Sequence, residues 1–264
     1  MAENKTPTHL ANKNAHERDK NILFEEIGHV YTVCGERGTF TSITTLIHKL
    51  FPSFNTDKIL NTILNSKKMN DPIYKYYGKT REDILQEWDI NKNIAAESGT
   101  NFHYDIECYY NGIENNNKSI EFSFFKKFVK DFPDLKCYRT EWCVYYEEYK
   151  LSGSIDCIME MDDGTIQIYD WKRCKSIEFE NCNNETAIIP CLKHLPNTNY
   201  HMYSLQLNLY KTILEEKYGK KVSGLFLVVC HPDNVYKTYE RIEVPFMEKE
   251  IKDILQWWKE KNNL

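Results

Sequence analysis

Three charged residues, Asp156, Asp170 and Lys172, stand in a stretch that reads as a β-hairpin and could share one active site. Residues 151–172 have the sequence LSGSIDCIMEMDDGTIQIYDWK, in which two apolar, β-rich runs flank a turn signal at 162–164. Side chains two apart in a strand point to one side, which places Asp170 and Lys172 together. If 162–164 form a three-residue loop, Asp156 lies directly opposite Asp170, with Cβ atoms roughly 5 Å apart. A two-residue turn would instead put the two aspartates on opposite faces.

Two carboxylates that face each other inside an apolar sheet need a chemical reason. Like charges directly opposite destabilise a ladder, and burial of the charges adds to the cost. A divalent cation is the simplest reason, since hard cations such as Mg²⁺ bind through one or two carboxylates together with phosphate oxygens. Lys172 beside that cation could orient or deprotonate a water molecule. On these residues alone, we interpret the hairpin as a centre for phosphodiester hydrolysis.

The same residues resemble the motif of the PD-(D/E)XK nuclease superfamily. The segment GSID that ends at Asp156 is followed by the segment DWK from Asp170 to Lys172, as in the D…(D/E)-x-K arrangement of that superfamily. The resemblance implies that Asp156 and Asp170 bind Mg²⁺ or Mn²⁺ together with the main-chain carbonyl of Trp171. It also implies that Lys172 positions the attacking water. The fold that goes with it is a restriction-endonuclease-like α/β fold, a mixed β-sheet flanked by helices.

Two helical patterns narrow the resemblance to the RecB-like branch of the superfamily. A glycine precedes His103 by four positions, and in that branch such a histidine is an additional metal ligand; imidazole suits Mn²⁺ better than Mg²⁺. After the DWK segment, a strongly helical stretch over 199–218 carries Gln206 and Tyr210 four residues apart. The branch has the same Gln-x-x-x-Tyr pair, which contacts nucleic acid and supports the active site. The resemblance covers residues 95–230, about half of the 264-residue chain.

Two glutamates are candidates for the surroundings of the metal. In a helix over 97–111, Glu107 lies one turn from His103 on the same face, where it either hydrogen-bonds to a ligand or belongs to a solvated surface. Glu141 lies in an expected strand over 138–147, at a position where relatives carry an acidic residue. It either completes the metal shell or pairs with a lysine.

Composition places the chain among globular proteins without a membrane span. Its 264 residues suffice for one large α/β domain with insertions, or for one domain and a helical annex. Hydrophobic residues make up 41% of the chain, while a mean hydropathy of -0.62 and the lack of a long apolar run exclude a transmembrane helix. The net charge of -5 argues against a broad basic surface for nucleic acid. It leaves room for a narrow cleft in which metal ions supply the positive charge.

Nine scattered cysteines without a C-x-x-C pair indicate free thiols rather than a disulfide framework or a zinc ribbon. Some relatives of the RecB-like branch hold an iron–sulfur cluster, with three of its cysteines near the C-terminus. Here only Cys230 follows Tyr210, so no iron–sulfur cluster is expected. The N-terminus lacks an apolar h-region, and neither a secretory signal nor a transit peptide is evident. These features predict an intracellular protein in a reducing compartment, such as the cytoplasm, the nucleus or a viral factory.

The remaining elements divide the chain into three expected parts. Residues 1–20 are polar and without periodicity, which predicts a disordered tail. Residues 21–94 are expected to form a hairpin and a mainly helical annex, in which Thr80 and Asp83 make a capping box. Residues 95–264 are expected to form the nuclease core. The expected elements are a hairpin over 22–33, helices over 57–65, 121–132 and 246–261, strands over 222–231 and 235–244, and a long irregular loop over 173–198.

The sequence therefore predicts a Mg²⁺- or Mn²⁺-dependent deoxyribonuclease. Among RecB-like nucleases, the pattern is most similar to stand-alone exonucleases of the mitochondrial genome-maintenance type and to proteins of large DNA viruses. That similarity implies processing of single-stranded ends or flaps in DNA repair. Two alternatives stay open. An RNA endonuclease of the same fold also uses histidine, acidic residues and lysine, and a catalytically silent module for nucleic-acid binding or assembly would need no cleavage.

Overall fold

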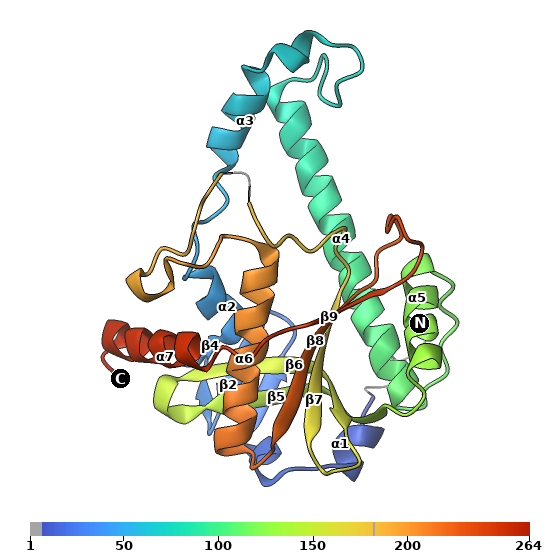
Figure 1. The fold of residues 1–264 in the computed structure, drawn as a ribbon, viewed down its shortest axis with the longest axis vertical. Helices are drawn as coiled ribbons and strands as arrows, with labels where there is room; N and C mark the ends of the chain where they lie inside the picture. The colour runs from blue at the N-terminus through green and yellow to red at the C-terminus, as the bar shows by residue number, and fades with distance from the viewer. Residues whose placement is uncertain (1–6, 182) are drawn as a thin grey trace. The chain divides into compact units, whose positions relative to one another are not determined.

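The structure is a computed structural model that describes residues 7–181 and 183–264 (Figure 1). The chain divides into two compact units, one made of Met1–Pro52 and Phe102–Leu264 and the other of Ser53–Asn101. The larger unit contains a six-stranded mixed sheet with helices on both faces, which confirms the predicted fold class. Within the described residues, no helix combines the length and the apolarity that crossing a membrane requires.

The hairpin with the candidate site forms the middle of the sheet, as β6 (Leu151–Glu160) and β7 (Ile166–Lys172). β5 (Lys136–Tyr146) pairs antiparallel with β6 along the whole of one edge. The other edge of β6 is shared, because β7 pairs antiparallel with its C-terminal part and the short β4 (Thr41–Ser42) pairs parallel with its first two residues. Residues 153–156 of β6 are therefore paired with β5 alone in the described structure, and the sheet is open on their other side.

Two further strands extend the sheet beyond β7. β8 (Val222–Val229) pairs parallel with β7 and is almost entirely buried, as its nearly continuous apolar sequence predicts. β9 (Glu240–Glu243) pairs antiparallel with β8 as the edge strand. The strand predicted over 235–244 is thus shorter than expected. Its first half forms a loop instead, because the side chain of Asn234 accepts a main-chain hydrogen bond there and Lys237 adopts a positive φ of 52°.

Helices cover the two faces of the sheet with separate apolar clusters. α6 (Asn199–Lys217) packs on one face, and α2 (Ile43–His48) and α7 (Glu248–Asn262) contact it. α5 (Ile120–Asp131) covers the other face, where two of its phenylalanines contact Trp171 edge-on. Short 3-10 helices lie in two of the connections, as η3 (Glu147–Tyr149) and η4 (Pro190–Leu192).

α4 (Arg81–Tyr110) is one continuous helix of 30 residues, where the sequence predicts two separate helices. Its start shows the predicted capping box: Thr80 N donates to Asp83 Oδ2 at 2.8 Å and Asp83 N donates to Thr80 Oγ1 at 3.2 Å. Gly99 does not interrupt the helix, because one interior glycine costs only about 1 kcal/mol relative to alanine. The smaller unit is mainly helical and consists of α3 (Thr56–Leu64), the 3-10 helix η2 (Lys67–Asn70) and the N-terminal part of α4.

The N-terminal residues are ordered where the structure describes them, which corrects the prediction of a disordered tail over 1–20. They contain α1 (His9–Lys13) and the 3-10 helix η1 (Glu17–Asn21). The Asp19 carboxylate accepts hydrogen bonds from Arg139 Nη1 and Trp142 Nε1, both at 2.8 Å. These partners lie 120 and 123 residues away in the chain, so the polarity of the segment alone gave no sign of them. Residues 1–6 of the predicted tail lie outside the described residues.

A small antiparallel sheet follows, made of β1 (Ile22–Glu25), β2 (Val30–Val33) and β3 (Glu36–Arg37). It confirms the hairpin predicted over 22–33, with Gly28 and His29 at positive φ in the turn. Side chains of β2 pack against Tyr145 of β5. The chain up to Pro52, which the sequence places partly in an annex, thus belongs to the same compact unit as the large sheet.

Candidate active site

The hairpin adopts the register that places Asp156 opposite Asp170. Its turn is a three-residue loop, and the β6–β7 ladder pairs Cys157 with Tyr169, so the next facing positions are those of the two aspartates. The ladder stops before them. In its place, the Trp171 N–H donates to the Asp156 carboxylate (Oδ2) at 2.9 Å. At the point where the sheet opens, a side-chain carboxylate thus accepts the hydrogen bond that a backbone carbonyl of β6 would accept in a regular ladder.

β5 brings a third carboxylate to this point. The β5–β6 register runs through Glu141 and Asp156 as facing positions, although these two residues are not themselves paired. Glu141 has a left-handed backbone with a φ of 43°, which turns it out of the regular ladder. Its carboxylate (Oε2) accepts a hydrogen bond from Ser154 Oγ at 2.9 Å. Glu141, Asp156 and Asp170 therefore occupy one row of positions across β5, β6 and β7.

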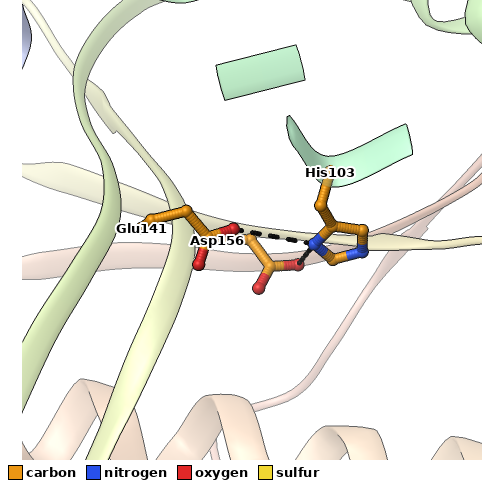
Figure 2. A group of neighbouring side chains, drawn as sticks. All are labelled: His103, Glu141 and Asp156. Carbon is orange, nitrogen blue, oxygen red and sulfur yellow. Dashed lines mark ion pairs between the residues drawn. The ribbon is translucent and has the colours of Figure 1, made fainter. Parts of the chain in front are cut away.

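His103 reaches this row from α4. Its Nδ1 lies 3.5 Å from Asp156 Oδ2 and 3.7 Å from Glu141 Oε1, and Figure 2 shows the imidazole facing the two carboxylates. One potential ligand atom from each of the three residues lies within 4.8 Å of the others. The His103 and Glu141 side chains are 29% and 34% exposed, so a cation held here would keep an open side for a substrate.

Asp170 and Lys172 form a buried ion pair on β7. The Lys172 ammonium lies 2.6 Å from Asp170 Oδ2, and the two side chains are 17% and 3% exposed. Apart from this contact, no hydrogen bond to Asp170 Oδ2 is found among the described residues. The ammonium also lies 4.4 Å from the centre of the Tyr203 ring on α6. Because a buried carboxylate oxygen without a hydrogen bond is costly, Asp170 is suited to bind a cation.

Burial and mutual repulsion perturb the pKa values of these groups. Burial raises the pKa of Asp156, repulsion from Glu141 adds to the effect, and His103 opposes it. Burial also raises the pKa of Asp170 from 3.8 to about 6; attraction to Lys172 opposes the rise, and repulsion from Asp156 adds to it. Burial alone would lower the pKa of Lys172, but the two aspartates outweigh it and the pKa is raised. The same balance raises the pKa of His103 to about 9, since Asp156 and Glu141 outweigh its burial.

These donors fit a hard divalent cation. In the protein without a cation, the raised pKa values show that the carboxylates of Asp156 and Asp170 are disfavoured as anions, and a cation would reverse that preference. Carboxylate oxygens suit Mg²⁺ and Mn²⁺, and the imidazole of His103 favours Mn²⁺. For Glu141 the sequence left two roles open, a metal ligand or the partner of a lysine. Its carboxylate lies within the group of potential ligand atoms. The ligand role of the Trp171 carbonyl stays a prediction.

α6 places Tyr210 over the face of β6 at Gly153, with Gln206 one turn before it on the same helix. Tyr210 is buried, and a Cβ added to Gly153 would lie 2.6 Å from its hydroxyl oxygen, so only glycine allows the ring to approach this closely. Burial raises the pKa of Tyr210, and a hydrogen bond from Gln206 opposes the rise. Tyr210 therefore supports β6 three residues before Asp156, whereas contact of the pair with nucleic acid stays a prediction. Tyr203, which touches Lys172, was not predicted, although its place one turn before Gln206 was a usable signal.

Glu107 lies one turn along α4 from His103. Burial raises its pKa to about 7, and repulsion from Glu141 and Glu26 contributes. Glu26 belongs to the turn of the N-terminal hairpin, so the small sheet borders the site. Among the described residues, Glu107 does not belong to the group whose ligand atoms lie within 4.8 Å of one another. The structure thus places Glu107 next to the candidate metal ligands.

No family model matches the sequence, and no curated protein matches it. Among solved structures, the crystal structure of SSO0001 is 14% identical over 94% of this chain and 82% of its own, with a TM-score of 0.33. The crystal structure of a "putative exonuclease" from Eubacterium rectale is 9% identical over 84% of this chain and 77% of its own, with a TM-score of 0.35. At these identities and TM-scores neither similarity shows a family, so function has to be inferred from the site.

Proposed function

We propose that this chain is a metal-dependent nuclease that hydrolyses phosphodiester bonds in DNA. The observation that carries the proposal is the group of His103, Glu141 and Asp156, whose ligand atoms lie within 4.8 Å of one another, with the ion pair of Asp170 and Lys172 at the facing position of β7. Perturbed acidic groups that converge at an opening in a sheet are typical of reactive centres. The buried lysine next to them favours catalysis over a purely structural ion site, because a structural site needs no additional cation.

The candidate ligands for the ion are the carboxylates of Asp156 and Asp170 and the imidazole of His103, with the Trp171 carbonyl and Glu141 as further donors. A bound divalent cation supplies Lewis-acid stabilisation of charge on a phosphate and acidifies water. The chain orients the ligands: the Trp171 N–H fixes Asp156, and Lys172 fixes Asp170. His103 has to lose its proton before it can act as a ligand.

Lys172 acts in this mechanism as a cationic hydrogen-bond donor. Its raised pKa keeps the ammonium protonated at neutral pH, so it orients a water molecule or stabilises charge on the phosphate and does not remove a proton. The Tyr203 ring and the Asp170 carboxylate hold the ammonium between them. Lys172→Ala should therefore abolish cleavage while the enzyme still binds nucleic acid.

Single-stranded ends or flaps of DNA are the substrates that we propose. The proposal draws on the resemblance of the Gln206 and Tyr210 helix to RecB-like nucleases, and it is supported by the position of that helix beside the strand that carries Asp156. The same site could serve RNA cleavage, which a direct comparison of strands would reveal.

A nuclease assay on end-labelled single-stranded, duplex, flap and circular DNA, with RNA of matched sequence, tests the proposal. With Mg²⁺ or Mn²⁺ the wild type should degrade linear DNA, and a chelator should stop the reaction. Asp156→Asn and Lys172→Ala should be inactive. Lys127→Ala is the matched control, because Lys127 pairs with Asp131 on the surface of α5 and should not affect cleavage.

The pattern of products separates the alternatives. Survival of circular single strands identifies an exonuclease, and nicking of the circle identifies an endonuclease. If only RNA is cleaved, the substrate is RNA and not DNA. Binding of DNA without cleavage, with either metal, would contradict the proposal and identify a silent binding module.

A further inference from the structure

The connection between β8 and β9 carries two exposed apolar residues, separate from the candidate metal ligands. Val235 is 82% exposed and Tyr236 is 79% exposed. Single apolar residues on a surface are ordinary, but two adjacent ones at the tip of a loop form a candidate contact surface. We refer to Val235 and Tyr236 as the loop tip.

Hydrogen bonds within the connection fix the loop tip in place. His231 and Asn234 are both buried at its base. Asp233 N donates to His231 Nδ1 at 3.1 Å, and Asn234 N donates to His231 O at 2.9 Å. Tyr236 N donates to Asn234 Oδ1 at 2.8 Å. A ligand that covers the loop tip would therefore meet a preformed turn and would not have to order a loose segment.

The loop tip belongs to the end of the sheet at which Lys172 lies. β7 and β8 are parallel neighbours, and Cys230 N donates to Lys172 O at 2.8 Å. Just beyond, Lys175 Nζ lies 3.1 Å from Asp233 Oδ2 and joins the segment after β7 to the loop. The β8–β9 connection, red in Figure 1, projects from the end of the sheet where β7 finishes. The carboxyl ends of parallel strands are where ligands bind in open α/β sheets.

The side chains around the loop tip suit a nucleic-acid strand. Tyr236 is followed by the exposed Lys237, which supplies positive charge beside the ring. Lys175, which is 75% exposed, lies against the same loop in an ion pair with Asp233. Aromatic side chains next to basic groups bind single strands without reading their sequence, because every base has a face that can stack and every linkage carries a negative charge.

We propose that Tyr236 stacks on a base of the nucleic-acid strand whose scissile phosphate lies at Asp170 and Lys172. Val235 extends the apolar surface under that base, and Lys237 neutralises a neighbouring phosphate. The inference rests on the proposed nuclease function and adds the element that holds the strand beside the cleaved bond. Because the loop tip carries no carboxylate, imidazole or ammonium, it acts on strand binding and leaves the chemistry to the β6–β7 hairpin.

The test is equilibrium binding of single strands that contain 2-aminopurine, a base whose fluorescence is quenched when it stacks. The full chain carries Lys172→Ala so that it binds without cleaving. Adding Tyr236→Ala should weaken binding by roughly 5- to 150-fold, the effect of one lost aromatic–base stack, and should remove the quenching. Tyr236→Trp should retain both. Tyr77→Ala is the control, since Tyr77 is a half-exposed tyrosine of the smaller unit and should not change the affinity.

A set of strands with one abasic position each then locates the contact. At the nucleotide that stacks, loss of the base should make Tyr236→Ala and its parent bind equally well, whereas elsewhere the difference should persist. If Tyr236→Ala binds every strand as tightly as its parent, or if Tyr77→Ala causes the same loss, the inference is wrong. The inference is also wrong if Tyr236→Ala leaves the affinity for DNA unchanged and alters only the oligomeric state measured by sedimentation. That result would show that Tyr236 contacts a second copy of the chain.

The outcome for the loop tip can be told apart from the outcome for the proposed function. DNA cleavage by the wild type together with unchanged binding in Tyr236→Ala would retain the nuclease and refute the stacking contact. If the wild type cleaves no DNA but the quenching depends on Tyr236, the stacking contact would be retained and the nuclease function refuted. A wild type that binds no nucleic acid would refute both.

Discussion

Asp170→Asn should stabilise the metal-free protein at neutral pH, although it removes a residue that we assign to the active site. Asp170 is buried beside Asp156, and its pKa is raised from 3.8 to about 6 even with Lys172 in contact. A pKa that is higher in the folded state means that the folded protein binds the proton more tightly than the unfolded chain does. The stability contributed by this group is therefore present at low pH and lost as pH rises from 3.8 to about 6.

The size of the effect follows from the same shift. Each pH unit of difference corresponds to about 1.36 kcal/mol, so the ionised Asp170 costs the metal-free protein about 3 kcal/mol above pH 6. Asparagine has nearly the same shape and no charge, and it avoids that cost. For a chain of this size, the variant should melt roughly 6–12 °C above the wild type near pH 8, with the difference shrinking as the pH falls.

The assay is thermal or denaturant unfolding in chelator from about pH 4 to about pH 8. Asp19→Asn serves as the control with the opposite sign. Hydrogen bonds from Arg139 and Trp142 outweigh burial and lower the pKa of Asp19, so this substitution should destabilise the protein at neutral pH, and the loss should shrink as pH falls. If Asp170→Asn is no more stable than the wild type near pH 8, or if the difference does not depend on pH, burial and the neighbouring Asp156 do not disfavour the ionised Asp170 carboxylate as described.

Metal ions should change the stability difference between the wild type and Asp170→Asn. An ion that binds only the folded state stabilises it by RT ln(1 + [L]/Kd), which is about 2.7 kcal/mol at 100 times Kd. Mn²⁺ or Mg²⁺ should raise the melting temperature of the wild type and have little effect on Asp170→Asn, so the gap between them should close. An equal shift in both proteins would show that Asp170 is not a ligand.

Three further predictions concern neighbouring residues. His103 has a pKa of about 9 in the metal-free protein, so the affinity for Mn²⁺ should rise with pH up to that value, while the proton that Mn²⁺ displaces from His103 is released below it and no longer released above it. Calorimetry should show that His103→Ala flattens both dependences and reduces the preference for Mn²⁺ over Mg²⁺. Gly153→Ala would place a Cβ 2.6 Å from the Tyr210 hydroxyl, so unfolding experiments should show a loss of about 1–3 kcal/mol, whereas a neutral effect would mean that the ring can move aside. Tyr203→Phe keeps the ring over the Lys172 ammonium and should retain kcat, whereas Tyr203→Ala should lower kcat more than it raises KM; equal rates in both variants would remove Tyr203 from the site.

The sequence predicts the centre of the site well, because local rules determine it. The three residues at the turn set the register, and the register places Asp156 opposite Asp170. A period of two in β7 then brings Lys172 to the same side. These relations depend on residues that are close along the chain, so the sequence narrows them to two registers, and the observed three-residue turn selects the one in which the aspartates face each other.

Other parts depend on geometry that spacing does not encode. The sequence left Glu141 between the metal shell and a lysine pair, and it could not show that the backbone leaves the regular ladder there at a φ of 43°, with the carboxylate among the candidate ligands. The bonds from Asp19 to Arg139 and Trp142 join parts of the chain that are far apart in sequence, so a segment that appears disordered by composition is held in place. The strand predicted over 235–244 fails in its first half, because alternation of apolar residues did not reveal the turn that Asn234 makes.

The hydrogen bond from Trp171 to Asp156 has a consequence for observing the site. The Trp171 amide belongs to a core strand, yet its proton is held by a titratable carboxylate and not by a neighbouring carbonyl oxygen. Trp171 lies between Asp170 and Lys172 in sequence, and the residue is 1% exposed. Exchange of that amide proton with deuterium should follow the charge and the ion occupancy of the site, while the other amides of β7 exchange only when the sheet opens. The candidate centre thus contains its own spectroscopic probe, through which NMR can detect ion binding before any substrate is known.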